Sequence, residues 1–436
     1  MSKTEPDAAD TYDVIVLGAG AGGMAAAVVA ANEGLDTLLL EKTEYVGGTT
    51  AVSGGMVWVP NNAKMAGAGL PDALEEAQKY LDATAGAENG DTDSAELRRV
   101  FLDAAPDAID YLDRNSQVQL VPLTFYPDYY PDLPGATQGG RVLEPMAFDA
   151  RELGESFKML RPPLPEFTLL GGMMVARPDI VHFRRIFKSP LSVLRVARLV
   201  AAYAWQRTRL HRGANLVLGN ALAGRLLKSL LLLGVEIRRN TVTRRLLEED
   251  GRITGVEIET PGGVQRIKAR RGVVLAAGGF SHDAALRGLL LPSEAGMHSA
   301  AAPGNTGDGV NLASRIEGLT RFYGVPLIIS ESAAAAAPEF IYRELDRVRV
   351  KGKLEPVRIF EPLEAGILGD GELESYHEAL AHYRAREWRQ ADDILAGLAA
   401  AAPASPLYAL YRQRIANFLI TPPADDWDAT VVHSEK

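Results

Sequence analysis

The sequence predicts an α/β protein that begins with a parallel sheet flanked by helices, and three observations predict this class. Residues 13–17, DVIVL, form the apolar, β-branched run of a strand buried on both faces. GAGAGG follows at once and leads into the Ala-rich run MAAAVVAANEG, which predicts a helix that ends at Gly34. A second apolar run, TLLLEK at 37–42, completes a strand–helix–strand unit.

Length and composition exclude several classes of protein. The chain of 436 residues is long enough for two to four domains at about 100–200 residues each. A net charge of −10 argues against bulk attraction to nucleic acid. The absence of cysteine excludes disulfides, thiolate metal ligands and a Cys-linked cofactor. No apolar run approaches the ~20 residues that span a bilayer, and the N-terminus has no apolar leader, so we expect a cytoplasmic protein.

The turn after the first strand carries the motif Gly18-x-Gly20-x-x-Gly23. Gly18 allows a tight turn, Gly20 lets the backbone approach a pyrophosphate at the helix N-terminus, and Gly23 lets the helix pack closely on the strand. Glu41 closes the second strand, where an acidic side chain accepts hydrogen bonds from a ribose. Strand, turn, helix and acid together predict a Rossmann-like dinucleotide site.

Two further motifs favour FAD over NAD as the dinucleotide. A loop of Gly, Ser and Thr at 47–55 follows Glu41 and Lys42 closely. An NAD site does not need this loop, whereas it suits a longer cofactor whose phosphates and ring continue across the domain. The run VVLAAGGF at 273–280 predicts a buried strand that ends in small residues, against which a cofactor could lie.

GAGAGG, LEKTEYVGGTTAVSGG and VVLAAGGFSHD resemble the FAD-binding flavoproteins of the fumarate reductase and 3-ketosteroid dehydrogenase group, over about residues 12–310. YPDYYPDLPG and GNTGDG resemble loops of the 3-ketosteroid Δ1-dehydrogenase branch. The resemblance implies non-covalent FAD, because the 47–55 loop offers no His for attachment. The residues that it implies at FAD are Gly18, Gly20, Gly23, Glu41, Lys42, Gly48, Thr49, Thr50, Ser53, Gly54 and Gly55, with Val242 at the adenine and Ala277 and Gly278 at the end of the late strand.

The resemblance also implies a reaction. In this branch a tyrosinate removes a proton beside a ketone, a Tyr hydroxyl and a backbone N–H polarise the ketone, and a hydride passes to the flavin. A tyrosine with its ordinary pKa of about 10 needs a helper to act as a base. Tyr129 matches the supporting tyrosine of the YPDYY motif; the alternative is that Tyr129 and Tyr130 only pack a loop. The implied substrate is a small apolar molecule such as a 3-ketosteroid.

The second half of that family, which carries the base, the polarising tyrosine and a closing segment over the flavin, is not found after residue 310. Residues 307–436 instead resemble the C-terminal part of class III adenylate cyclases. The matching residues are Asn311 and Arg315, of an N-x-x-x-R pair, and Lys351 and Lys353, of a triphosphate-binding segment. The cyclase carboxylates that hold Mg²⁺ are missing, so we expect no metal site and no cyclase activity.

The chain therefore resembles two truncated proteins joined at Gly307-Asp308-Gly309. We expect an FAD-dependent dehydrogenase that binds FAD but is catalytically impaired. The alternatives are a nucleotide-signalling fusion derived from a cyclase and a non-functional chimera.

The expected organisation places a cap inside the FAD-binding domain and two foreign segments after it. A helix pair in the tail cannot bury its faces alone, so it should pack on the preceding strands or on a partner. The ranges are a disordered lead at 1–11, an FAD-binding domain at 12–140 and 213–310, a cap at 141–212, a truncated cyclase-like α/β segment at 311–363 and a helical, tetratricopeptide-like tail at 364–436.

Residues 182–212 differ from the rest of the chain in charge. They carry eight Lys or Arg, and no acid occurs between Asp179 and Glu236. Such a segment suits peripheral contact with an anionic membrane. The alternative, a solvated face of a helix pair in the cap, is favoured by the negative charge of the whole chain. The sequence does not indicate an oligomeric state.

Overall fold

The chain divides into two compact units. Unit 1 contains residues 1–247, 253–278 and 300–304, and unit 2 contains residues 248–252, 279–299 and 305–436. The structure, a computed structural model, describes residues 11–85, 92–249, 252–260, 263–284, 286–287, 299–314, 323, 325, 328–331, 334, 341–349, 357–363, 369, 371–402, 405–424 and 427–432.

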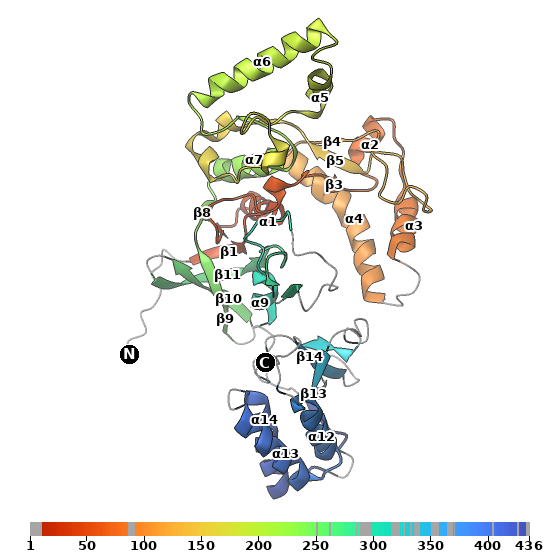
Figure 1. Ribbon diagram of the computed structural model, residues 1–436, viewed down its shortest axis with the longest axis vertical. Coiled ribbons are helices and arrows are strands. Elements are labelled where there is room, and N and C mark those ends of the chain that lie inside the picture. The colour runs from red at the N-terminus through yellow and green to blue at the C-terminus, as the bar shows by residue number, and fades with distance from the viewer. Residues whose placement is uncertain are drawn as a thin grey trace. The chain divides into compact units, whose positions relative to one another are not determined.

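A six-stranded sheet forms the base of unit 1, in the order β8-β2-β1-β11-β10-β9 (Figure 1). β1 pairs in parallel with β2 and with β11, so the predicted strand–helix–strand unit is confirmed. β2 also pairs in parallel with β8, whereas β10 and β11 are antiparallel. The strands are β1 (Thr11–Leu17), β2 (Thr37–Leu40), β8 (Glu236–Arg238), β9 (Val242–Glu249), β10 (Arg252–Thr260) and β11 (Gly263–Leu275).

Helix α1 (Ala21–Asn32) packs against this sheet, and helix α7 (Leu218–Leu232) packs against α1. Small residues in α1, such as Ala27, allow the close approach, and its Met24 and Val28 are fully buried. α7 buries 11 of its residues, because α1 and residues 50–52 and 142–159 pack against it. The core of unit 1 therefore lies around these two helices.

The end of β11 was predicted from the run at 273–280 to be buried, and this prediction is wrong. Val274 and Leu275 of β11 are each 37% exposed, whereas Ile15 and Val16 of the neighbouring β1 are fully buried. An apolar run gives the strand, but it does not tell whether the second face of the sheet is covered.

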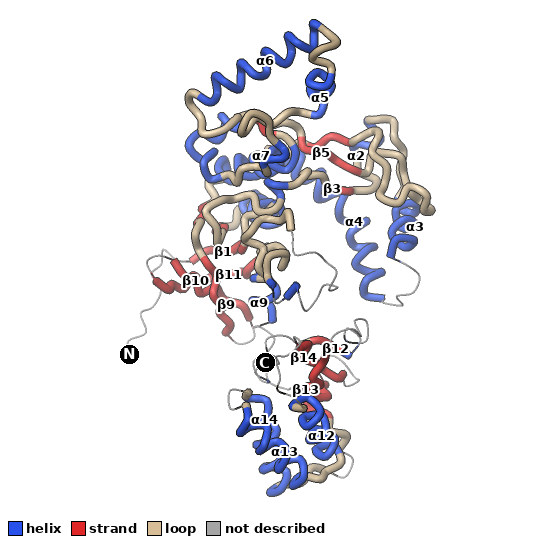
Figure 2. Tube along the Cα trace, in the orientation of Figure 1, coloured by secondary structure: helices blue, strands red, loops and turns tan. Residues whose placement is uncertain are grey.

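The remaining elements of unit 1 lie beyond the two central helices (Figure 2). β3, β5 and β4 form an antiparallel sheet, and β6 pairs with β7. The bounds are β3 (Val57–Trp58), α2 (Ala63–Gly67), α3 (Leu74–Ala85), α4 (Thr92–Asn115), β4 (Leu120–Pro122), β5 (Val142–Pro145), β6 (Phe148–Asp149), α5 (Arg177–Arg184), α6 (Pro190–Arg207) and β7 (Asn215–Leu216), with 3-10 helices η2 (Thr50–Val52), η3 (Ala150–Met159) and η4 (Pro165–Phe167).

Unit 2 combines a four-stranded sheet, in the order β12-β14-β13-β15, with helices. The tail helices pack on the strands, as expected: the hydroxyls of Tyr376 and Tyr411 donate to the carbonyl of Leu345 in β13. The described part of the tail holds three helices. The bounds are α9 (Asp308–Ser314), β12 (Ile329–Ser330), β13 (Ile341–Arg349), β14 (Val357–Leu363), α12 (Glu372–Arg384), α13 (Trp388–Ala401), α14 (Pro406–Ile420) and β15 (Thr430–Val432).

Aromatic rings gather among the tail helices of unit 2. The rings of Trp388 and Trp427 lie 5.5 Å apart between centroids, and Tyr383 stands 5.7 Å from the first and 5.6 Å from the second. Phe418 contacts all three rings. These four residues are called the aromatic cluster.

Several expectations fall on residues that the structure does not describe. Residues 1–10 of the expected lead, and Arg315, Lys351 and Lys353 of the cyclase resemblance, lie outside the described residues. Among the residues that are described, none of the helices has the length and apolar character to cross a membrane. The same residues include no group of three or more His, Cys, Asp or Glu that could hold a metal ion.

Candidate cofactor site

The turn between β1 and α1 is shaped by close contacts of backbone with backbone. Gly18, with φ +102°, donates its N–H to the carbonyl of Leu40 (N···O 2.7 Å). A Cβ atom at Gly18 would lie 2.4 Å from the carbonyl oxygen of Ala276, and one at Gly23 would lie 1.8 Å from the carbonyl oxygen of Gly18. Neither position has room for a side chain, so the turn needs glycine at both.

Gly20 lies in a different environment from these two glycines. A Cβ atom there would have no heavy atom of the chain within 4 Å. The space beside Gly20 is therefore open, at the N-terminus of α1, where a ligand could approach the backbone.

The first turn of α1 offers amide donors to that space. The first hydrogen bond within the helix runs from the Met24 N–H to the carbonyl of Gly20 (2.9 Å). The N–H of Ala21 donates to Oγ1 of Thr50 (3.1 Å), so Thr50 ties the 47–55 loop to the helix. The amides of Gly22 and Gly23 have no acceptor within the helix, and helix N-termini favour anions.

Glu41 is held in place by the chain around it. The residue is 8% exposed. Its Oε2 accepts from the N–H of Ala19 (2.9 Å), and its Oε1 accepts from the N–H and the hydroxyl of Thr43 (2.9 and 2.8 Å). A carboxylate has about four acceptor sites, so these three bonds leave capacity for a ribose hydroxyl. The carbonyl of Glu41 accepts from the N–H of Thr241, which brings the neighbouring Val242, 39% exposed, beside it.

The 47–55 loop is folded against the turn. Gly47 donates its N–H to the carbonyl of Ala19 (2.7 Å). Gly48 has φ +48°, and a Cβ atom there would lie 3.2 Å from Cα of Gly20. Thr49 accepts through Oγ1 from the N–H of Ala302 (3.1 Å). The loop thus lies along one side of the open space beside Gly20.

The end of this loop is fixed against α7. The Ser53 hydroxyl donates to the carbonyl of Thr50 (2.9 Å) and accepts from the N–H of Gly55 (3.1 Å). A Cβ atom at Gly55 would lie 2.4 Å from Cα of Gly219 in α7, whereas one at Gly54 would meet only Met56, at 3.9 Å. Gly55 is therefore needed for packing, and Gly54 is less constrained.

The remaining predicted residues lie on two sides of the turn. Ala277 and Gly278 follow the end of β11, and Cα of Ala277 would be 2.9 Å from a Cβ atom at Gly18. Lys42 lies next to the 300–304 segment, because its Cε would be 3.4 Å from a Cβ atom at Gly304. The structure thus brings the sequence-predicted set into one part of unit 1.

These residues fit a dinucleotide. The open space at Gly20 is bordered by first-turn amides suited to a pyrophosphate and by a carboxylate with capacity for a ribose. Of the nearby glycines, Gly18, Gly23 and Gly48 are in contact with neighbouring backbone, whereas Gly22 is as open as Gly20. The contacts of each residue with FAD stay predictions.

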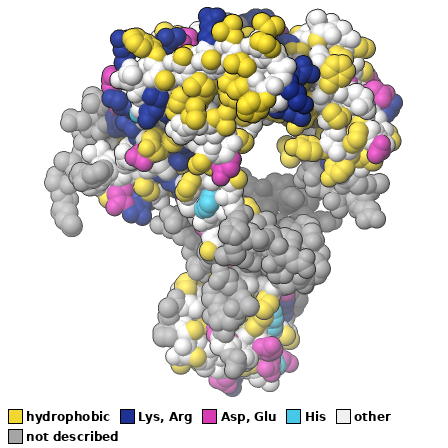
Figure 3. Space-filling view, turned by 45° about the horizontal axis from the view of Figure 1, so that its top comes forward, with side chains coloured by type: hydrophobic (Ala, Val, Ile, Leu, Met, Phe, Trp, Pro, Cys, Tyr) yellow, Lys and Arg dark blue, Asp and Glu magenta, His cyan; other side chains and the backbone are white. Residues whose placement is uncertain are grey.

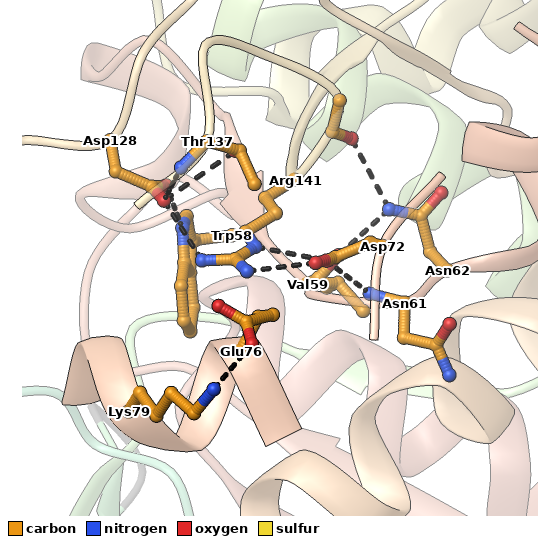
Figure 4. Close-up of polar contacts among 11 residues, drawn as sticks. Trp58, Val59, Asn61, Asn62, Asp72, Glu76, Lys79, Asp128, Thr137 and Arg141 are labelled. Carbon is orange, nitrogen blue, oxygen red and sulfur yellow. Dashed lines mark hydrogen bonds and ion pairs between the residues drawn. The ribbon is translucent and has the colours of Figure 1, made fainter. Parts of the chain in front are cut away.

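The loop that carries Tyr129 is anchored by a buried ion cluster (Figure 4). Arg141, fully buried, donates through Nε and Nη2 to the carboxylate of Asp72 (2.9 and 2.8 Å) and through Nη1 to Asp128 (2.9 Å). Asp128 also accepts from Nε1 of Trp58 (2.7 Å) and from the N–H of Thr137 (3.0 Å). We call Asp72, Asp128 and Arg141 the Arg141 cluster.

Electrostatics favour the charged forms of Asp72 and Arg141. Desolvation by burial is the largest influence on Asp72 and acts to raise its pKa, but the hydrogen bonds from Arg141 and from the Asn61 N–H outweigh it, so the pKa of Asp72 is lowered. For Arg141, the two carboxylates outweigh desolvation, and its pKa is raised. The guanidinium also lies 5.8 Å from the centre of the Trp58 ring and 6.0 Å from that of Tyr80, within cation–π range.

Tyr129 and Tyr130 project from the loop that this cluster holds. The side chain of Tyr129 is 92% exposed, which disagrees with the alternative that it only packs a loop, whereas Tyr130 is 61% exposed and keeps part of its surface covered. The sequence analysis singled out the YPDYY string but missed Asp72 and Arg141. Asp128 within the string was a signal for an anchored loop, whereas its partners carry no local signature.

Fold and site together define a dinucleotide-binding flavoprotein of the Rossmann-like class. The family described as FAD binding domain matches residues 13–323, and the chain belongs to this family. The match extends beyond the junction that we expected near residue 310. No comparison supports the resemblance of the C-terminal part to adenylate cyclases.

Three relatives show where in this family the chain falls. It is 37% identical to a 3-oxosteroid 1-dehydrogenase of Mycolicibacterium smegmatis over 70% of this chain and 53% of the relative. It is also 37% identical to a 4-oxocyclohex-2-ene-1-carboxylate 5-dehydrogenase of Sinomonas cyclohexanicum, over 69% and 50%. The structure of a 3-ketosteroid Δ1-dehydrogenase from Sterolibacterium denitrificans, in complex with 1,4-androstadiene-3,17-dione, aligns with TM-score 0.63 at 35% identity, over 80% of this chain and 59% of that one. The chain spans about half the length of the curated relatives that it matches.

Proposed function

We propose that this chain is an FAD-dependent oxidoreductase of the 3-ketosteroid dehydrogenase type, which acts on a CH–CH bond beside a ring ketone in a small apolar substrate. The open space at Gly20, bordered by first-turn amides and Glu41, is the observation that carries the proposal. The substrate class rests on the names of the relatives, which act on 3-oxosteroids or on oxocyclohexene carboxylates.

Such a dehydrogenation breaks two C–H bonds on neighbouring carbons and forms a C=C bond, with one hydrogen leaving as a proton and the other as a hydride. Bound FAD supplies the two-electron acceptor that this chemistry needs. The residues proposed to hold it are the first-turn amides of α1, the 47–55 loop and Glu41. Tyr129, which projects from the loop that the Arg141 cluster anchors, is proposed to support a base through a hydrogen bond from its phenol.

We also propose that turnover by this chain alone is impaired. In unit 2, burial raises the pKa of Tyr376 and Tyr411 well above the ordinary value and that of Tyr383 to about 12. Burial also raises the pKa of Tyr323 and Tyr408. A phenol with such a pKa stays protonated near neutral pH, so none of these five tyrosines suits the role of a base. A missing base typically costs ~10²–10⁴-fold in rate, and a missing oxyanion donor ~10²–10³-fold.

FAD titration tests the binding part of the proposal. A Gly20→Val side chain enters open space, so the variant should keep the Tm of the apoprotein but bind FAD at least ~100-fold more weakly, since it blocks backbone approach to a pyrophosphate. Quenching of FAD fluorescence measures the affinity. Gly67→Val is the matched control, because a Cβ atom at Gly67 in α2 also meets nothing within 4 Å. Equal FAD affinity in the Gly20→Val and Gly67→Val variants would contradict the assigned site.

Turnover tests the impairment. With FAD in excess, a 3-ketosteroid and an artificial electron acceptor, we expect rates several orders of magnitude below those of the Mycolicibacterium smegmatis enzyme. A rate comparable to that enzyme would overturn the impairment. If that rate also fell in Tyr129→Phe, the role of Tyr129 would stand while the impairment fails.

A further inference from the structure

Helices α5 and α6, with the turn between them, expose an unusual set of large apolar side chains. Phe187 is 99% exposed, Leu191 76%, Leu194 68% and Trp205 62%. Ile180, Val181 and Val193 add partly exposed apolar surface. Figure 3 shows hydrophobic side chains gathered over the upper part of the molecule, bordered by Lys and Arg. We call residues 180–209 the α5–α6 surface.

Four exposed residues of α6 lie along one face of the helix. Leu191, Leu194, Arg198 and Trp205 are separated by three, four and seven residues, which is the spacing of a single helical stripe. The opposite face holds the helix to the protein: Ser192, Val196 and Tyr203 are the buried residues of α6. The exposed stripe is therefore not needed to hold α6 to unit 1.

Polar contacts keep this helix pair in place. Arg195 of α6 donates to both carboxylate oxygens of Asp179 in α5 (2.7 and 3.1 Å). The Tyr203 hydroxyl donates to the carbonyl of Leu170 (2.9 Å). The pair thus presents its apolar residues from an ordered support, and its one acid, Asp179, is buried and already paired.

The charge on this surface is positive throughout. The exposed bases of the α5–α6 surface are Arg184, Arg185, Lys188, Arg195, Arg198, Arg207 and Arg209, of which Arg195 pairs with Asp179. Arg209 lies 4.7 Å from the centre of the Trp205 ring, so a base and an aromatic ring stand side by side at the end of α6. A second copy of the chain would bring like charges together, and a polyanion without an apolar phase would leave Phe187 and the leucines in water.

We propose that the α5–α6 surface docks on an anionic lipid bilayer, with Phe187, Leu191, Leu194 and Trp205 in the interface and the bases at the headgroups. Exposed Leu, Phe and Trp next to Lys and Arg, without free acids, are the composition of interfacial helices. The link to an apolar substrate, which partitions into membranes, rests on the proposed function; the docking itself rests on exposure and charge alone.

Co-sedimentation with vesicles tests the docking without FAD or steroid, so its outcome is independent of the cofactor site. The full chain should pellet with vesicles of phosphatidylcholine mixed with phosphatidylglycerol and much less with phosphatidylcholine alone. Added salt should weaken the binding, because the headgroup attraction is screened. Absence of binding to the anionic vesicles would overturn the proposal.

Two surface variants assign the contact. The combined change Phe187→Ser, Leu191→Ser and Leu194→Ser, and separately Lys188→Gln with Arg198→Gln, should each weaken vesicle binding about tenfold or more. Phe125→Ser, which alters another residue of 94% exposure, is the matched control and should leave binding unchanged. Because all these side chains are exposed, the variants should keep the Tm of the parent. Equal binding of the control and the two surface variants would contradict the assignment.

The mass of the protein in solution separates this proposal from self-association. A dimer that dissociates in the Phe187 variant would identify a second copy as the occupant and overturn the lipid proposal. A shift of tryptophan emission to shorter wavelength on vesicle addition, lost in Trp205→Phe, would place Trp205 in the interface and support it.

Discussion

The cofactor turn at 18–23 and the Tyr129 loop are both shaped to present groups to a ligand, but different forces hold them. In the turn, backbone meets backbone: Gly23 leaves no room for a Cβ atom against the Gly18 carbonyl. In the loop, one buried side chain, Arg141, joins Asp72 to Asp128. The turn depends on six consecutive residues, whereas the Arg141 cluster joins residues that are far apart in the sequence. Substitutions should therefore affect the two regions in different ways.

Arg141→Met should have the largest effect on stability. The change leaves two buried carboxylates without a counter-charge, which costs about 3–5 kcal/mol in free energy of unfolding. Urea unfolding measures the loss. The triple variant with Asp72→Asn and Asp128→Asn removes the stranded charges and should recover a large part of it. A loss below about 1 kcal/mol would show that the loop has another anchor.

Gly23→Ala should destabilise unit 1 by about 1–3 kcal/mol, because the methyl group would lie 1.8 Å from the Gly18 carbonyl oxygen and α1 must shift. Gly22→Ala is the control on the same helix turn. A Cβ atom at Gly22 meets nothing within 4 Å, and alanine favours the helix. In thermal unfolding of the apoproteins, Gly23→Ala should lower the Tm relative to the parent, whereas Gly22→Ala should raise it. Equal changes in Tm for the two variants would contradict the claim that close backbone contact at Gly23 shapes the turn.

Acid should destabilise the Tyr129 loop at a higher pH than the turn at 18–23, because backbone contacts, which do not titrate, stabilise the turn. The pKa of Asp72 is lowered below its ordinary 3.8, so its contribution to stability is complete above about pH 4 and is lost as the pH falls through the lowered value. Unfolding free energy measured from pH 5 downward should fall less steeply in Asp72→Asn than in the parent. An identical pH dependence of the unfolding free energy in both proteins would mean that the partners of Asp72 do not stabilise its carboxylate.

Tyr129→Phe should have the smallest effect on stability, within about 0.5 kcal/mol, because the side chain is 92% exposed. Any dehydrogenation that is measured would need a base, so Tyr129→Phe, which removes the support of that base, should lower the rate, whereas the neighbouring change Tyr130→Phe should leave the rate at the value of the parent. Initial rates with a 3-ketosteroid compare the two. A fall of equal size in both would indicate disturbance of the loop rather than loss of one phenol.

The strand–turn–helix–strand core could be predicted because its determinants are local. GAGAGG needs glycine where backbones touch, and the apolar runs on either side fix β1 and β2. The Arg141 cluster could not be predicted in this way, since Asp72 and Arg141 meet only through the tertiary fold. The exposure of Val274 and of the α6 stripe could not be predicted either, because an apolar run indicates which side chains could be buried but not which part of the protein covers them.

The aromatic cluster of unit 2 gives the protein an internal optical reporter. Trp388 and Trp427 stand within 5.5 Å of each other, beside Tyr383, in a chain with four tryptophans. Rings fixed so closely couple their electronic transitions, so the near-ultraviolet circular dichroism of the folded protein should be dominated by unit 2. The other two tryptophans, Trp58 and Trp205, lie in unit 1. The melting of the two units can therefore be followed by separate signals in the unlabelled protein.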